Sequence, residues 1–399
     1  MHRDLFALGD GIYLLNHSVG RPPLSAETAA RDGFFEPWRT GAIEPWDAWF
    51  AEVDRFRAAV GALLGSDAEN VCPQANLSSA LTKIVHALPR HSGRDTIVYT
   101  EADFPSMGFV LAMAGRAGFR LRCIPDTADF STLDCWKSAL DDDCCLALVT
   151  HVHSNTSRQV PVGDICRLAR EREIMTVVDV AQSAGIVPID VGAWNADFVI
   201  GSCVKVLCGG PGAGFLWVSD RVLHECQPTD VGWFSHADPF EFDIHHFRYA
   251  ESALRFWGGT PAVLPYSVAA NSLEILVGIG IERIRAHSLE LTQTLIDNIP
   301  RKQLFTPARP ASRGGTVVLD FGEQQSAAAA ALADSGVHFD VRRSGMRLSP
   351  HIYTSPQEIE TVVSCLAPCA RAAVKWAPNP RSSHEYRSKG RQPDEHIEP

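Results

Sequence analysis

TVVDVAQSAG, residues 176–185, opens a stretch that closes with ADFVIGSCVKVLCGGPGAGFLWVS, residues 196–219. Three short apolar runs lie in and around it, at Met175–Val178, Phe198–Ile200 and Gly214–Val218. None of them shows the apolar and polar alternation of a strand with one wet face. The runs therefore predict strands buried on both faces, in the core sheet of an α/β protein.

Two ionisable residues lie beside these predicted strands. Asp179 follows the first run, at the carboxyl end where open α/β sheets bind ligands, and Lys205 lies between the second and third runs. A buried lysine has a lowered pKa, and its neutral amine can condense with an aldehyde. An aspartate can pair with a protonated pyridine nitrogen. Either residue alone would more simply be a turn cap or a loop cation, but the two together predict a site for pyridoxal 5'-phosphate.

The same residues belong to a longer pattern. D-x-A-x-S-A-G, ADFVIGS, the lysine and the glycine-rich GGPGAGFLWVS follow one another in order. This pattern resembles the class V aminotransferase family of fold-type-I pyridoxal phosphate enzymes, and most closely the kynureninases. The resemblance implies that Lys205 carries the cofactor, that Asp179 pairs with its pyridine nitrogen, and that Gln182 lies beside its ring or phosphate. It also implies an amino-acid substrate and a homodimer with shared active sites.

The composition is that of an ordinary globular protein. Of the 399 residues, 45% are hydrophobic, and the formal net charge is -11. That charge would repel nucleic acid and anionic lipid. No run reaches the roughly 18 apolar residues of a membrane span, and MHRDLFALGDGIYLL lacks the apolar core of a signal peptide. The cytoplasm is therefore the expected location, with no nucleic-acid or membrane partner.

The cysteines do not predict a metal site or a disulfide framework. There are 11 of them, an odd number, and they are dispersed among apolar residues, which suits reduced thiols. Cys365 and Cys369 form a C-x-x-x-C pair without nearby histidines. We expect no metal.

The N-terminal segment resembles a second family motif. A short apolar run leads into Asn16-His17-Ser18-Val19-Gly20, and a helix is expected from about Ser25. The matching kynureninase motif brings a serine to the substrate, so the resemblance implies that Ser18 contacts the substrate. An equal alternative is that Asn16 and Ser18 only shape the turn.

A predicted helix start offers a place for the cofactor's phosphate. Cys72-Pro73-Gln74-Ala75 is expected to form a turn, and Asn76 is a good N-cap for the helix that follows. The amides of a helix start carry a partial positive charge and can hold a phosphate. The family binds its phosphate at this turn, so the resemblance implies contacts from Ala75 and Asn76, although the family's usual glycine and threonine are replaced.

Three more segments resemble the kynureninases. ADFP follows the predicted strand Thr96–Thr100, and although such a ring is more often a lid on the core, the related D-N-F-P segment favours stacking of Phe104 on the cofactor ring. VGWFSHADPFEFD and ALRFWGGTP match two further segments. They imply that Trp233 borders the cofactor or substrate, and that Gly259 and Thr260 reach the phosphate of the neighbouring subunit.

The order of strands and helices predicts a mostly parallel, seven-stranded sheet in a large domain and a smaller α+β C-terminal domain. We expect an N-terminal arm and helix in 1–44, the large cofactor-binding domain in 45–264, the small domain in 265–376 and a disordered tail in 377–399. A long helix from about Pro265 should join the domains. Arg347 is expected in a strand, where family members use an arginine to bind the substrate's carboxylate.

Departures from the family patterns leave the reaction open. Val204 stands where kynureninases have a tyrosine that touches the phosphate, a contact that Ser202 can replace as a serine does in desulfurases. Ala80 stands where kynureninases have a larger residue that faces the substrate. No cysteine precedes Arg347 in its loop, so the nucleophilic thiol of a desulfurase has no counterpart.

The leading hypothesis is a kynureninase-like lyase or hydrolase that cleaves a bond at the substrate's Cβ. Cysteine desulfurase-like or C–S lyase chemistry is one alternative, and aminotransferase or epimerase chemistry, which needs no extra residues, is another. A catalytically inactive homologue is a third. The intact Asp179 and Lys205 argue against that one.

Overall fold

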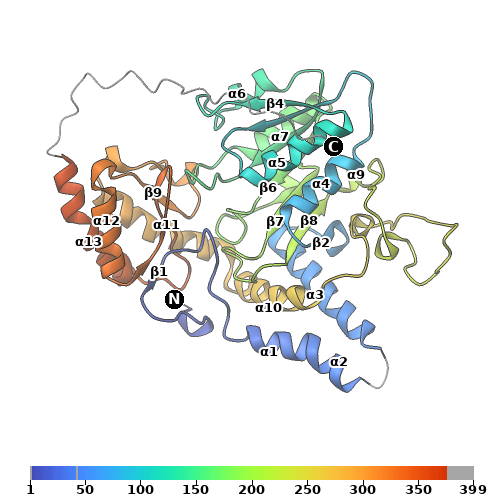
Figure 1. Ribbon diagram of the computed structural model, residues 1–399, viewed down its shortest axis with the longest axis horizontal. Helices are drawn as coiled ribbons and strands as arrows, with labels where there is room; N and C mark the ends of the chain where they lie inside the picture. The colour runs from blue at the N-terminus through green and yellow to red at the C-terminus, as the bar shows by residue number, and fades with distance from the viewer. Residues whose placement is uncertain (1, 42–43, 375–399) are drawn as a thin grey trace, which may run out of the picture.

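A seven-stranded sheet forms the centre of the protein in the computed structural model, which describes residues 2–41 and 44–374 (Figure 1). In sheet order its strands are β2 (Val71–Gln74), β8 (Gly214–Val218), β7 (Phe198–Ser202), β6 (Met175–Asp179), β5 (Cys144–Thr150), β3 (Thr96–Thr100) and β4 (Arg120–Ile124). β8 is antiparallel to both of its neighbours, and the other neighbouring strands pair in parallel. The predicted α/β class and mostly parallel seven-stranded sheet are confirmed.

The three predicted strands of the central stretch are β6, β7 and β8, which lie side by side. Val177 and Val178 are neighbours in β6, are both fully buried, and belong to different hydrophobic clusters. Consecutive side chains of a strand point to opposite faces, so both faces of the sheet are covered. Residues 72–74, predicted as a turn, are part of β2 instead, because they pair with the edge of β8.

Helices cover the two faces of this sheet (Figure 1). α4 (Leu77–Ala87) and α5 (Pro105–Ala114) contribute to one hydrophobic cluster, and α3 (Trp46–Leu64), α7 (Val162–Glu171) and α10 (Leu264–Ile279) contribute to the other. The shorter helices are α1 (Ala26–Ala30), α2 (Glu36–Thr40), α6 (Leu133–Ala139), α8 (Val191–Trp194) and α9 (Asp220–Leu223). Ala80, which stands where kynureninases have a larger residue, is fully buried in the cluster under α4.

A bend separates α10 from α11 (Ile281–Asn298) where the sequence predicts one long helix. The two helices meet at 78°. Gly280 forms the junction with a φ of 95°, a conformation that glycine adopts at little cost because it lacks a Cβ. The bend carries the chain from the sheet to the smaller part of the protein.

The smaller part joins helices to a three-stranded antiparallel sheet. Its elements are α11, β9 (Val317–Leu319), α12 (Gln325–Asp334), β11 (Asp340–Arg342), β12 (Gly345–Leu348) and α13 (Pro356–Val374), with the strands in the order β11–β12–β9. The N-terminal arm, residues 2–24, lies against this part, because β1 (Ile12–Tyr13) pairs in parallel with β10 (Val337–His338) (Figure 1). The predicted disordered tail, 377–399, lies outside the described residues.

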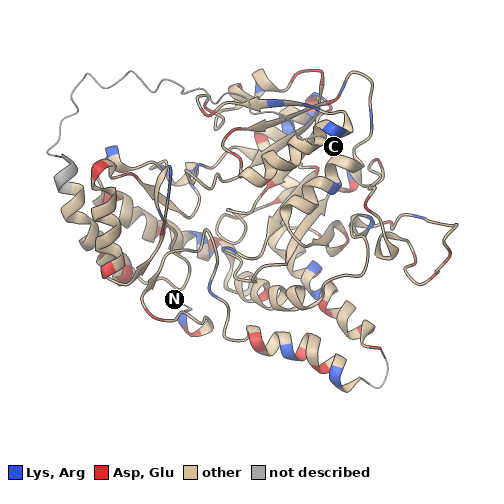
Figure 2. Ribbon diagram, viewed as in Figure 1, with Lys and Arg blue, Asp and Glu red and all other residues tan. Residues whose placement is uncertain are grey.

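Charged residues of both signs are interspersed along the chain (Figure 2). Within the described residues, no single helix is long and apolar enough to cross a membrane, and α10 and α11 reach the required length and composition only as a bent pair. The described residues also contain no group of three or more His, Cys, Asp or Glu placed to hold a metal ion.

Candidate active site

The carboxyl edge of the central sheet brings together residues that are distant in sequence. Asp179, the last residue of β6, pairs with Ile200 of β7. Ser202, the last residue of β7, pairs with Gly214, the first residue of β8. The loop between β7 and β8 carries Lys205 and therefore starts and ends at this edge. A ligand at this edge lies outside the strand ends, as in other open α/β sheets.

Lys205 and Asp179 influence each other's protonation. Burial lowers the pKa of Lys205; the charge of Asp179 opposes this shift, and the charges of Arg347 and Arg342 add to it. Burial raises the pKa of Asp179 to about 6. The hydrogen bond from the Ala181 amide and the charge of Lys205 both lower this pKa, but by less than burial raises it. The Ala181 amide donates to Oδ1 of Asp179 at 2.8 Å, and no other described residue donates to this carboxylate. Its Oδ2 is therefore available to a ligand.

The ring of Phe104 lies beside the lysine. It stands just before α5, and its centroid is 5.6 Å from Nζ of Lys205. Phe104 is 40% exposed, so part of its side chain is open to a ligand. It offers a flat apolar surface to a planar ligand next to the amine.

The N-terminal arm supports the lysine loop. The Gly20 amide donates to the Val204 carbonyl at 2.9 Å. A Cβ at Gly20 would overlap the carbonyl oxygen of Lys205, so only glycine fits this contact. The Gln182 side-chain amide donates to the His17 carbonyl at 3.1 Å, which ties the arm to the segment that follows Asp179. Gln182 thus joins the arm to the segment after β6, and its contact with the cofactor ring or phosphate stays a prediction.

The start of α4 lies next to the end of β7. Asn76 caps this helix as predicted, because its side chain accepts from the Ser79 amide at 2.9 Å. Ala75 and Asn76 are exposed. A Cβ at Gly214 would come within 3.3 Å of the Asn76 Cα, and Gly214 pairs with the partly buried Ser202. The free amides of this helix start therefore lie beside the strands that flank the lysine loop.

Arg347 of β12 brings the smaller part of the protein to the site. It is almost fully buried, and its Nε donates to Oδ1 of Asp340 at 2.8 Å while its Nη2 donates to Oδ2. Nη1 donates to the Ser154 carbonyl at 3.2 Å. Nε2 of His17 lies 2.9 Å from the same Oδ1 of Asp340. Ser18, the predicted arm residue, is partly buried and has no side-chain bond to the described residues.

Trp233, Gly259 and Thr260 are the remaining residues that the sequence predicts at the cofactor or substrate. Trp233 packs in an aromatic cluster, in which its neighbours are Trp46, Phe234, Phe240 and Phe242. Gly259 and Thr260 are exposed. Any contact of these three residues with cofactor remains a prediction.

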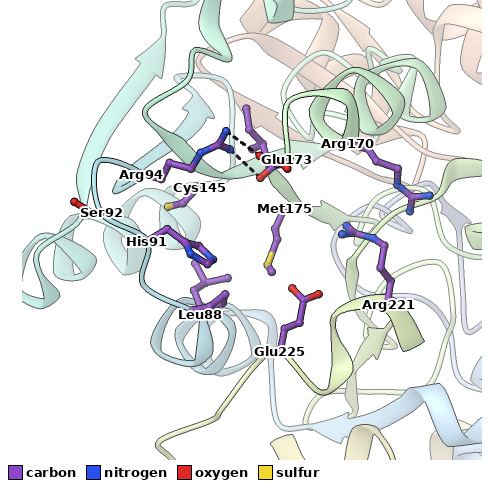
Figure 3. A pocket seen from close by; sticks show the side chains of 12 residues that line it. Leu88, His91, Ser92, Arg94, Cys145, Arg170, Glu173, Met175, Arg221 and Glu225 are labelled. Atoms are coloured by element: carbon purple, nitrogen blue, oxygen red, sulfur yellow. Dashed lines mark hydrogen bonds and ion pairs between the residues drawn. The ribbon is translucent and has the colours of Figure 1, made fainter.

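A cavity of about 450 Å³ lies at the opposite, amino edge of the sheet (Figure 3). Its wall includes Met175, the first residue of β6, and three arginines, Arg94, Arg170 and Arg221. Each guanidinium is already bound by oxygen atoms of the protein, as the dashed lines from Arg94 to Glu173 illustrate. These arginines hold neighbouring segments together, at the end of β6 away from Asp179.

The chain matches one protein family over most of its length. The family described as Aminotransferase class-V matches residues 47–362. The chain belongs to the class V aminotransferase family. The predicted family is confirmed, and its cofactor is pyridoxal 5'-phosphate. An amine, an aromatic face and a carboxylate oxygen without a partner meet at one edge of this class V chain, so its residues fit that cofactor.

Individual relatives of this class V chain differ in name. The kynureninase of Deinococcus radiodurans is 33% identical over 326 residues, which are 77% of this chain and 77% of that one. An uncharacterized aminotransferase of Bacillus subtilis is 27% identical over 322 residues, which are 81% of this chain and 85% of that one.

Solved structures share the fold of this class V chain. The cysteine desulfurase from Thermococcus onnurineus NA1 has a TM-score of 0.77 at 21% identity and covers 91% of this chain and 95% of its own. The cystine C–S lyase C-DES, in complex with cysteine persulfide, has a TM-score of 0.80 at 20% identity, with coverage of 90% and 98%. The predicted fold-type-I architecture is thereby confirmed.

Proposed function

We propose that this protein is a pyridoxal phosphate enzyme that cleaves a bond at Cβ of an α-amino acid, as a kynureninase does. One observation carries the proposal: Lys205, Asp179 and Phe104 lie at one edge of the sheet, and Nη1 of Arg347 donates to the carbonyl of Ser154, which follows β5 at that edge. Relatives named kynureninase at 29% and 33% identity support cleavage at Cβ rather than another class V reaction.

Each residue has a chemical task in this proposal. When bound, pyridoxal phosphate withdraws electrons from Cα of the amino acid attached to it. Lys205 holds the cofactor and then moves the Cα proton, because its lowered pKa leaves more of the amine in the basic, neutral form. Oδ2 of Asp179 accepts from the pyridine nitrogen, and Phe104 packs on the ring. Arg347 grips the substrate's carboxylate.

The remaining residues bind the cofactor's phosphate or contact the substrate. The exposed amides at the start of α4 bind the phosphate, together with a hydroxyl at the end of β7. Gln182 fixes the arm beside the cofactor, and the arm brings Ser18 towards the substrate. In this scheme the phosphate ligands are Ala75, Asn76 and Ser202.

A homodimer would complete the site. The loop between Trp233 and Thr260 exposes large apolar side chains, with Phe242 74% and Ile244 90% exposed. Apolar surface of this kind is usually covered by a partner. We propose that a second copy of the chain covers it, and that Trp233, Gly259 and Thr260 reach the cofactor of that copy.

β-Elimination at a C–S bond is the second candidate. Val204 and Ser202 favour it. Val204 stands where kynureninases have a tyrosine that touches the phosphate, and Ser202 can make that contact instead, as a serine does in the desulfurases. The nucleophilic thiol that a cysteine desulfurase uses has no counterpart here, because no cysteine lies in the β11–β12 hairpin, residues 340–348. Transamination and epimerisation need only the residues already assigned, and an inactive homologue would stay colourless with added pyridoxal phosphate.

The test is a substrate screen on the cofactor-loaded protein and its Lys205→Ala variant. We expect an amino acid to give a product cleaved at Cβ with the wild type, and no turnover with Lys205→Ala. Anthranilate from L-kynurenine, and alanine, pyruvate and sulfide from cysteine-type substrates, are measured in parallel. We expect L-kynurenine to be a poor substrate, because Val204 alters the pocket. Its efficient hydrolysis would make this a true kynureninase, whereas sulfide or pyruvate would place it among the C–S lyases.

The Lys205→Ala variant also tests the lysine directly. Borohydride should attach the cofactor to the wild type and not to the variant. Covalent attachment in Lys205→Ala would assign the cofactor to another residue.

A further inference from the structure

The guanidinium of Arg347 has N–H groups to spare although it is buried. An arginine side chain carries five N–H donors, and Arg347 is 2% exposed. Nε and Nη2 donate to Asp340, and Nη1 donates to the Ser154 carbonyl. These bonds leave one N–H on each terminal nitrogen. Such a pair matches the two oxygens of a carboxylate.

Asp340 is also bound by His17 and, at 3.4 Å, by Nε of Arg342. Nε2 of His17 lies 2.9 Å from Oδ1 of Asp340. Burial raises the pKa of Asp340, but the hydrogen bonds from His17 and Arg347 outweigh burial and hold that pKa below its usual range. Burial lowers the pKa of His17. The histidine is therefore a neutral N–H donor near pH 7, and the aspartate is an anion.

The backbone around His17 is fixed at both ends of the site. The Asn16 side-chain amide donates to the Ser349 carbonyl at 2.7 Å, just after β12. The Gln182 amide donates to the carbonyl of His17, just after β6. The imidazole therefore reaches the carboxylate from a segment that is tied to the smaller part and to the central sheet.

We propose that Asp340 and His17 are positioning residues that orient Arg347 so that its two spare N–H groups face the α-carboxylate of the substrate. The proposal rests on the proposed role of Arg347 as the carboxylate clamp. Asp340 takes the side of the planar fork formed by Nε and Nη2, which leaves the end of the fork for the substrate. A guanidinium held in place loses little further freedom when the carboxylate binds.

A purely structural ion pair would behave differently. It would hold β11, β12 and the arm together, and its loss would lower the melting temperature and weaken all ligands alike. A positioning pair affects ligands that carry a carboxylate and spares those that do not. The comparison of two ligands therefore separates the two roles.

The test titrates the cofactor-loaded full chain with L-alanine, which has an α-carboxylate, and with ethylamine, which lacks one. Cofactor absorbance reports binding, and the melting temperature is recorded for every variant. In Asp340→Asn we expect the dissociation constant of L-alanine to rise about 10- to 100-fold, as for loss of a charge-assisted hydrogen bond. The constant for ethylamine should change less than about two-fold. Asp334→Asn, exposed at the end of α12, is the matched control and should change neither constant.

Two variants of His17 test its part in the pair. His17→Leu removes the N–H donor and should weaken L-alanine binding without affecting ethylamine. His17→Gln keeps an N–H donor of similar reach and should restore most of the affinity. Equal binding by the two variants would remove His17 from the proposal.

Arg347→Leu separates the two possible failures. If this variant keeps the wild-type preference for L-alanine over ethylamine, Arg347 is not the clamp and that part of the proposed function fails. If Arg347→Leu loses the preference while Asp340→Asn keeps it, the positioning proposal alone is overturned. Equal weakening of both ligands in Asp340→Asn also overturns it, because that result marks a structural pair.

Discussion

At the scale of single residues, Asp103 shows how strongly burial acts beside the site. It is 8% exposed, and its Oδ2 accepts from the Thr100 amide at 2.8 Å. Its Oδ1 is buried and accepts no hydrogen bond from the described residues, with Nδ1 of His153 4.0 Å away. Burial raises the pKa of Asp103 to about 6, and the charge of Asp103 in turn raises the pKa of Asp179. The ionised form of Asp103 therefore costs stability.

Replacing Asp103 should remove a pH-dependent cost. The folded-state pKa of about 6 exceeds the 3.8 of an unperturbed aspartate, so folding takes up a proton between these pH values and the carboxyl's contribution to stability falls as the pH rises through them. Asp103→Asn should thus stabilise the protein relative to wild type most at pH 7.5, and this advantage should shrink by about 2 kcal/mol at pH 4.5. Urea unfolding at both pH values measures the difference.

The exposed Asp334→Asn serves as the control for that experiment and should show no such change between the two pH values. A constant difference between Asp103→Asn and wild type at pH 7.5 and 4.5 would mean that Asp103 titrates normally.

At the scale of elements, the α10–α11 junction isolates the effect of backbone conformation. Gly278 and Gly280 both have open space where a Cβ would be, but only Gly280 has a positive φ, of 95°. Gly280→Ala should therefore cost about 1–3 kcal/mol of unfolding free energy through backbone strain. Gly278→Ala, inside α10, should raise the free energy of unfolding by about 0.5–1 kcal/mol, because alanine loses less backbone entropy than glycine when a helix forms.

Chemical denaturation of the two alanine variants provides the measurement. A Gly280→Ala protein as stable as Gly278→Ala would show that the junction relaxes freely and that glycine is not required for the bend.

Element patterns in the sequence predicted most of the sheet but not the junctions between elements. β6, β7 and β8 are continuous apolar runs, and a run of this kind has few alternatives to a buried strand. The capping of α4 by Asn76 was equally local and was predicted. The bend at Gly280 was missed because an isolated glycine in an apolar helix pattern does not reveal its φ. β2 was missed because its strand conformation depends on pairing with β8, which is distant in sequence.

The candidate site divides in the same way. Lys205, Asp179 and Phe104 stand at ends of local patterns, so the sequence singles them out as candidates, and the structure brings Nζ of Lys205 to 5.6 Å from the centroid of the Phe104 ring. His17 and Asp340 had no such signal, because they meet across 323 positions and only the folded chain joins them.

At the scale of the whole molecule, the exposed apolar loop predicts the oligomeric state. Phe242 and Ile244 are 74% and 90% exposed, and burial of such side chains at an interface contributes about 1.5–3 kcal/mol each. The wild type should sediment as a dimer, and a Phe242→Asp, Ile244→Asp double variant should shift towards monomer. Analytical ultracentrifugation over a range of concentrations measures the shift.

Phe305→Asp is the control for the dimer test, since Phe305 is 50% exposed in the smaller part of the protein. It should leave the dimer intact. A wild type that sediments as a monomer at every concentration would rule out the shared sites.

The N-terminal arm also determines when the site is completed during synthesis. Asn16 binds the carbonyl of Ser349, 333 positions later, and the arm segment that carries Asn16 also supplies His17 and Gly20 to the site. A ribosome that adds about 5–20 residues per second needs about 15–70 seconds to make the intervening chain. Once β8 (Gly214–Val218) has been made, the central sheet can form around Lys205, whereas the arm has no partner until β12 follows. The contacts that join Arg347, Asp340 and His17 therefore form last, after the sheet edge that carries Lys205.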